Sequence, residues 1–168
     1  MRTSLATLLG GAAVVLALPV TTAAQSASIT ARADVAVALT ATAGDSLRFG
    51  AVFPNTTRTI LPTDAASGSF SLAGAAGAEV SVTFTLPASL TDGVNNLAVT
   101  FGANAGSRNT ANARAGSTTF NPAAALVANL DGTTGNLYLF IGGAVSPTTE
   151  PNGTYVGTVQ LTAAYTGN

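Results

Sequence analysis

The sequence predicts an all-β domain with the architecture of an antiparallel β-sandwich. Three observations support this prediction. Apolar and polar residues alternate with a period of two in several separate stretches, Asp-Gly and Asn-Gly turn signals stand between them, and the abundant alanines form no apolar stripe of helical period. The pattern amounts to about seven to nine strands at the spacing expected of a sandwich.

The first alternating stretch runs from Ile29 to Thr42. Successive side chains of a strand point to opposite faces, so its apolar odd-numbered positions are expected to share one face. These positions are Ile29, Ala31, Ala33, Val35, Val37 and Leu39. We expect this stretch to be either the first strand of the domain's own sheet or a strand donated to another copy.

Four later stretches alternate in the same way, namely residues 47–53, 80–86, 97–101 and 155–165. In the first of these, Leu47, Phe49, Ala51 and Phe53 are expected to share one face. Residues 68–73 are a shorter candidate strand. Leu137–Ile141 is apolar on both faces, which is typical of a central strand.

The turn signals and the segments without a period complete the prediction. Asp92-Gly93, Asp131-Gly132 and Asn152-Gly153 are typical of tight hairpins. A short helix is expected, if anywhere, at residues 122–130. Residues 102–119 show no consistent period and are predicted to form a long surface loop or an irregular edge strand.

The first 24 residues have the three parts of a secretory signal peptide. Arg2 is followed by an uncharged apolar run from Leu5 to Val20 and then by small residues up to Ala24. A membrane anchor needs about 20 apolar residues, more than this run supplies. We expect cleavage before Gln25, a single domain at 25–168 with no membrane span, and export to the periplasm, the cell surface or the extracellular space.

The composition excludes most catalytic chemistry. The chain has no histidine, cysteine or lysine, so it is expected to hold no cofactor, no metal and no catalytic site built on those residues. A glycosidase with two carboxylates remains a formal alternative. Calcium bound by Asp131, Thr133 and Asn136 is another, although a plain hairpin turn is the favoured interpretation.

The charge of the chain also restricts its partners. The formal net charge is −1, and removal of Arg2 with the signal peptide would leave five arginines against seven acidic residues. Such a surface offers no basic patch to phosphates, so nucleic-acid binding is not expected.

Three segments together resemble a known family. They are LRFGAVFP at residues 47–54, LYLFIGG at residues 137–143 and GTYVGTVQLTAAY at residues 153–165. In these segments the chain resembles the exported bacterial domains of unknown function that are related to spore coat protein U and to fimbrial-subunit domains. The resemblance implies an immunoglobulin-like or pilin-like β-sandwich located in the periplasm, on the cell surface or in a surface appendage.

Two functional hypotheses follow from these predictions. The first is a non-enzymatic structural or adhesive protein, such as a fimbrial or coat-like subunit, that associates with itself or with another surface protein through strand addition by residues 29–42. The second is a monomeric secreted or periplasmic module that binds a glycan or a protein through the loop at residues 102–119. Arg108 and Arg114 are the candidate contact residues of that loop.

Overall fold

Twelve strands and no helix make up the part of the chain that the structure describes. The computed structural model describes residues 25–31 and 37–167. The strands are β1 (Thr40–Ala43), β2 (Arg58–Ile60), β3 (Gly68–Ala73), β4 (Glu79–Thr85), β5 (Ser89–Thr91), β6 (Asn96–Thr100), β7 (Gly106–Asn109), β8 (Thr118–Phe120), β9 (Leu126–Asn129), β10 (Asn136–Ile141), β11 (Gly143–Val145) and β12 (Gln160–Tyr165). The all-β prediction is confirmed, while the predicted number of strands was too low because several strands are only three or four residues long.

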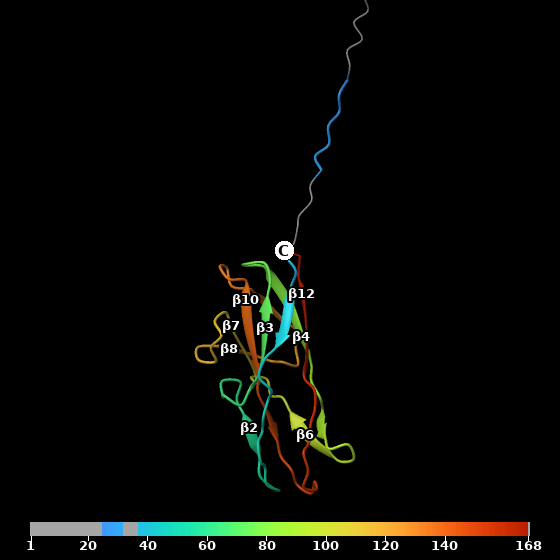
Figure 1. The fold of residues 1–168 in the computed structure, drawn as a ribbon, viewed down its shortest axis with the longest axis vertical. Helices are drawn as coiled ribbons and strands as arrows, with labels where there is room; N and C mark the ends of the chain where they lie inside the picture. The colour runs from blue at the N-terminus through green and yellow to red at the C-terminus, as the bar shows by residue number, and fades with distance from the viewer. Residues whose placement is uncertain (1–24, 32–36, 168) are drawn as a thin grey trace, which may run out of the picture. The chain divides into compact units, whose positions relative to one another are not determined.

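The strands form three antiparallel sheets within the compact unit of residues 35–168. The five-stranded sheet has the order β1-β3-β10-β7-β8, the three-stranded sheet β12-β4-β9, and the four-stranded sheet β2-β11-β6-β5. Figure 1 shows β3, β7 and β10 in the upper half of this unit, and β2 and β6 in the lower half. The predicted central strand at residues 137–141 is confirmed, because β10 lies between β3 and β7.

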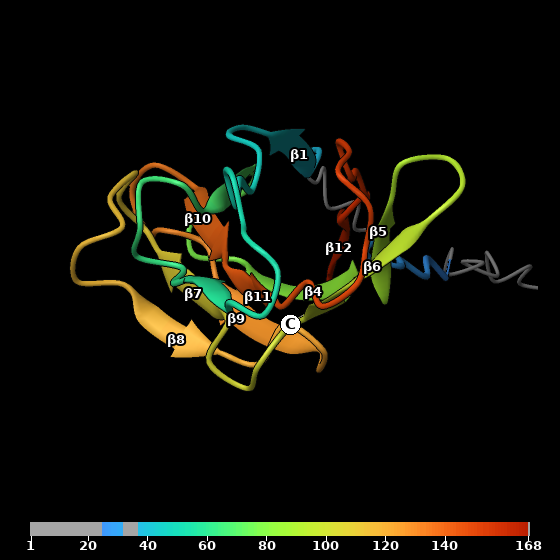
Figure 2. The ribbon, with the colours of Figure 1, turned by 90° about the horizontal axis from the view of Figure 1, so that it is seen from below.

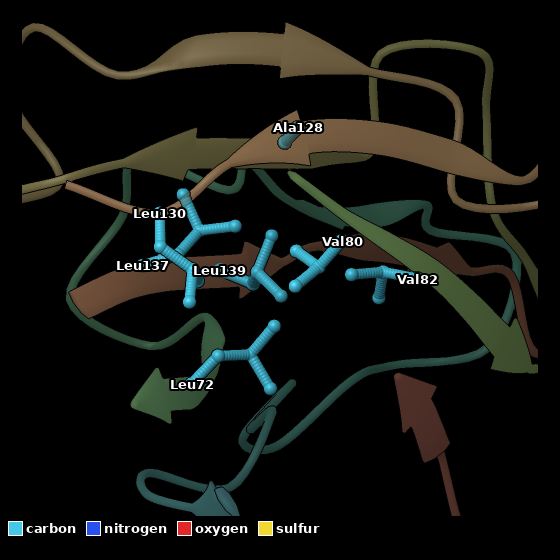
Figure 3. Close-up of a cluster of buried hydrophobic side chains, with 7 residues drawn as sticks. All are labelled: Leu72, Val80, Val82, Ala128, Leu130, Leu137 and Leu139. Carbon is cyan, nitrogen blue, oxygen red and sulfur yellow. The ribbon is translucent and has the colours of Figure 1, made fainter. Parts of the chain in front are cut away.

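The main core lies between the five-stranded and the three-stranded sheet. Its seven buried side chains come from β3, β4, β9, β10 and the turn between β9 and β10: Leu72, Val80, Val82, Ala128, Leu130, Leu137 and Leu139. Figure 3 shows these side chains pointing toward one another. Val80 and Val82 alternate with polar residues in the sequence, and Leu137 and Leu139 belong to the fully apolar run. Burial of one face of a strand explains the alternation. The fold is sandwich-like.

A second, smaller core supports the four-stranded sheet. Leu97 and Val99 of β6 pack with Val145 of β11, and partly buried aromatic residues surround them. The chain reaches this sheet from the first one through Gly142, where β10 runs on into β11 (Figure 2). A Cβ atom at Gly142 would collide with the carbonyl oxygen of Ile60. Only glycine therefore fits where the strand changes sheets.

The predicted first strand was largely wrong. Strand β1 begins only at Thr40 and pairs with β3 of its own sheet. Ile29 and Ala31 are exposed and lie outside any strand, and Val37 is exposed as well. Leu39 packs against the main core, and Ala33 and Val35 lie outside the described residues.

The predicted strand at residues 47–53 is also wrong, and Gly50 is the reason. Its φ of +69° lies in the left-handed region, where a strand cannot continue. The turn shifts the alternation by one residue, so Val52 joins the second core and Phe53 is 73% exposed. Residues 44–57 contain no strand.

The remaining predictions were mixed. Residues 68–73, 80–85 and 97–100 are strands as predicted, whereas the last strand begins at Gln160 rather than at residue 155. Residues 122–130 contain β9 and no helix. The Asp92-Gly93 turn does join a hairpin, β5 to β6. The Asp131-Gly132 and Asn152-Gly153 turns lie instead on connections between different sheets.

Candidate binding groove

A groove of about 980 Å³ lies beside the second core. Two strips of chain that belong to no strand form its walls, residues 44–54 and residues 151–159. Its apolar lining includes Leu97, Val99 and Phe101, which come from β6 and the residue after it, and Ile141 and Val145, which come from β10 and β11. We call this feature the groove, and we call its walls the first and the second strip.

The backbone of the first strip is hydrogen-bonded to the domain at few positions. Gly44 and Arg48 donate backbone hydrogen bonds to Ser69 and Ala66, at 2.8 and 2.9 Å, and Asn55 donates one to Pro147 at 2.7 Å. Between these points, the N–H groups of residues 49–53 make no hydrogen bond to any described residue. Backbone groups without a partner in their own domain can form hydrogen bonds with another chain.

The second strip is attached at one place along its length. Val156 exchanges two backbone hydrogen bonds of 2.8 Å with Thr91 of β5, and regular pairing with β4 resumes only at Gln160. Gly157 lies against β5, because a Cβ atom there would meet the side chain of Leu90 at 2.7 Å. The N–H groups of residues 157–159 have no backbone partner among the described residues.

The five-stranded and the three-stranded sheet approach each other at the edges formed by β1 and β12 (Figure 1). No backbone hydrogen bond joins these two strands in the described part of the chain. The Tyr165 hydroxyl accepts a hydrogen bond of 2.7 Å from the Ala75 N–H, and Leu39 packs close by against the main core. Side chains therefore close the gap between β1 and β12 at the end nearest Tyr165. At its other end this gap opens into the groove.

Few charged groups border the groove. Arg114 beside Asp45 donates a hydrogen bond to its carboxylate and holds the pKa of that group below its usual value. The backbone N–H of Thr148 lowers the pKa of Glu150 in the same way. Burial raises the pKa of the Tyr155 hydroxyl, and the charges of Asp92 and Glu150 add to that effect. The lining of the groove is more apolar than polar, and its charged residues are Asp45, Arg48 and Glu150.

The structure does not bring the two predicted contact arginines together on a free loop. Residues 102–119 were predicted to form a long loop or an irregular edge strand; they contain β7 and the start of β8, which is an edge strand of the five-stranded sheet, and the rest of this range lies outside strands. Arg108 lies within β7, paired with Leu139 of β10. Arg114 does lie on a loop, but its guanidinium is bound to Asp45 and Ser67 of its own domain. Arg114 is thus bound within its own domain, and the binding-module hypothesis stays a prediction.

The predicted calcium ligands form an ordinary turn. One carboxylate oxygen of Asp131 accepts hydrogen bonds from the N–H groups of Thr133 and Thr134, at 3.0 and 2.7 Å. These bonds lower the pKa of Asp131 and stabilise the turn between β9 and β10. Among the described residues, no group of three or more acidic side chains is arranged to hold a metal ion.

The two strips were missed by the sequence analysis, although one signal marks both. The alternating stretch at residues 47–53 has Gly50 at its centre, and the stretch at residues 155–165 has Gly157 near its start. A glycine inside a strand pattern often indicates a bulge or a close approach of two backbones. These two positions are where regular pairing is lost.

No protein-family model matches the sequence, and no curated protein matches it either. No helix of the described residues is long and apolar enough to cross a membrane.

Proposed function

We propose that this protein is an exported, non-enzymatic structural or adhesive subunit that assembles by strand addition. The observation that carries the proposal is the groove, because both of its strips contain backbone N–H groups without a backbone partner among the described residues. Strand addition satisfies such groups through main-chain hydrogen bonds, and apolar side chains of the added strand fill the floor. The resemblance to spore coat protein U and fimbrial-subunit domains is in keeping with this role.

The occupant that we propose is the N-terminal segment of a second copy, residues 25–37. Ile29, an apolar residue of this segment, is 95% exposed. Every second residue from Ile29 to Val37 is apolar, as a strand with one buried face requires. Thirteen extended residues span roughly 43 Å, whereas the eleven residues of the first strip would span roughly 36 Å even if they were fully extended. The segment is long enough to fill the groove.

The absence of enzymatic activity is supported by the composition. A chain without histidine, cysteine and lysine lacks the residues that most nucleophilic and acid–base sites use. A chain in which only 8% of the residues are charged also offers little repulsion between copies.

Self-association of residues 25–168 tests the proposal. Sedimentation velocity between roughly 1 µM and 1 mM, the range of weak to moderate affinities, is expected to show species larger than a monomer. The double variant Ile29→Asp, Val35→Asp places charges on the apolar face of the segment and is expected to remain monomeric, because charges in an apolar groove are costly.

The matched control is the double variant Thr30→Asp, Ala36→Asp, which adds the same charges to the other face of the same segment. It is expected to associate like the unmodified protein. A monomer at every concentration for the unmodified protein, or equal association of the two double variants, would overturn the proposal.

A further inference from the structure

The side chain of Arg114 joins two parts of the domain that are distant in sequence. Its Nε donates to Ser67 Oγ at 2.9 Å, and its Nη2 donates to Asp45 Oδ2 at 2.8 Å and to the Ser67 carbonyl at 3.3 Å. The guanidinium also lies over the Phe140 ring, 4.9 Å from its centroid. The side chain is only 23% exposed, so these bonds are partly shielded from water.

The loop that carries Arg114 is itself braced. Asn109 Nδ2 donates to the carbonyls of Ala113 and Ala115, at 2.8 and 3.3 Å, and Ser117 Oγ donates to the Arg114 carbonyl at 2.7 Å. These hydrogen bonds fix the backbone around Arg114 independently of its contact with Asp45. The loop starts from β7 and ends at β8, two neighbouring strands of the five-stranded sheet.

Asp45 is the point at which the first strip leaves that sheet. Its N–H donates to Ser69 Oγ at 2.7 Å, and its carbonyl accepts from the Ser69 N–H at 2.9 Å. After Arg48, no backbone bond attaches the strip to the domain until Asn55. The hydrogen bond of Arg114 to Asp45 therefore adds a side-chain attachment at the start of the strip.

From this geometry we infer that Arg114 is a positioning residue for the groove. Arg114 fixes the upper end of the first strip against the five-stranded sheet and so keeps the two strips at the separation that an added strand bridges. The effect on assembly rests on the proposed function. The positioning of the strip by Arg114 does not, because it is a property of the isolated domain. A planar guanidinium can bind three acceptors at once, which the single ammonium of a lysine cannot do with the same geometry.

Hydrogen exchange of residues 25–168 tests the positioning directly. In Arg114→Ala, the bonded amides of Asp45 and Arg48 are expected to exchange about tenfold faster, as loss of charged hydrogen bonds predicts. Amides of β4 and β10 in the main core are expected to keep their protection. Arg114→Lys is expected to give an intermediate rate, because it restores the charge beside Asp45 without the bonds to Ser67.

The matched control is Arg108→Ala. Arg108 belongs to β7 of the same sheet, and its side chain makes no hydrogen bond or ion pair with another described residue. It is expected to leave exchange at Asp45 and Arg48 unchanged. If Arg114→Ala does not fold, Asp45→Asn removes the same ion pair from a largely exposed position and is expected to raise exchange at the same amides.

Sedimentation of the same variants tests the consequence for assembly. Arg114→Ala is expected to weaken self-association about tenfold, and Arg108→Ala is expected to have no effect. Faster exchange that is equal throughout the domain, or no difference from Arg108→Ala, would overturn the positioning role. A monomeric unmodified protein would instead refute strand addition, and the exchange rates would still decide whether Arg114 positions the strip.

Discussion

The Tyr165 hydroxyl and the Ala75 N–H are joined by a hydrogen bond of 2.7 Å, although the two residues are 90 positions apart. Tyr165 is the last residue of β12 in the three-stranded sheet, and Ala75 follows β3 of the five-stranded sheet. The bond therefore links the two sheets at the edge where β1 and β12 are not hydrogen-bonded to each other.

Tyr165→Phe removes this bond and leaves the Ala75 N–H without its partner. We expect the free energy of unfolding to fall by about 1 kcal/mol, measured by urea denaturation. Tyr138→Phe is the control, because the Tyr138 hydroxyl makes no hydrogen bond with another described residue. Equal losses in the two variants would contradict a linking role for Tyr165.

Two fully buried serines are expected to respond in opposite directions to replacement by alanine. Ser107 Oγ has no hydrogen-bond partner among the described residues, so Ser107→Ala should stabilise the domain by about 1 kcal/mol. Ser67 Oγ binds Arg114 Nε and the Pro62 carbonyl, so Ser67→Ala should cost about 2 kcal/mol. Denaturant unfolding of both variants checks the pair, and destabilisation of Ser107→Ala would show that its hydroxyl is bonded after all.

Gly142→Ala tests the crossing between sheets. The added Cβ would collide with the Ile60 carbonyl oxygen and lie 2.8 Å from the Leu61 carbonyl carbon. Because both are backbone atoms, we expect a loss of about 3 kcal/mol. Gly102→Ala places the same methyl group where no heavy atom lies within 4 Å and is expected to leave the thermal midpoint nearly unchanged.

Gly50→Ala tests the shift in alternation in the first strip. The φ of +69° at this residue is expected to cost an alanine about 1 kcal/mol. Gly93→Ala is the control, since Gly93 has a φ of +99° and lies in the turn between β5 and β6 rather than in the groove. Both variants should lose similar stability, but only Gly50→Ala should alter self-association in sedimentation experiments.

Stability is expected to be flat between about pH 5 and 8, because the chain has no histidine to titrate in that range. Hydrogen bonds lower the pKa values of Asp45, Asp92, Asp131 and Glu150 in the folded state. Their contribution is therefore fully present above the unfolded-state pKa values of about 4 and is lost as the pH falls through the lower folded-state values. Urea unfolding at a series of pH values checks this, and a decline already between pH 7 and 5 would contradict it.

The sequence by itself determined the strands that bury one face or both. Burial explains the residue types in these strands. It accounts for the period of two at residues 80–85 and 97–100 and for the fully apolar run at residues 137–141. Gly68–Ala73 was found for the same reason. Local alternation is enough in these cases because the neighbouring strands only complete a face that the sequence already defines.

Only the tertiary structure decided which alternating stretches are paired. Residues 47–53 and 155–159 carry the same pattern as true strands, but Gly50 turns one strip and Gly157 packs the other against β5. Arg114, a candidate for contact with a partner, is bound instead by Asp45, a residue 69 positions earlier. Pairing and ion-pair partners are set by distances between remote segments, and a periodicity along one segment contains no information about those distances.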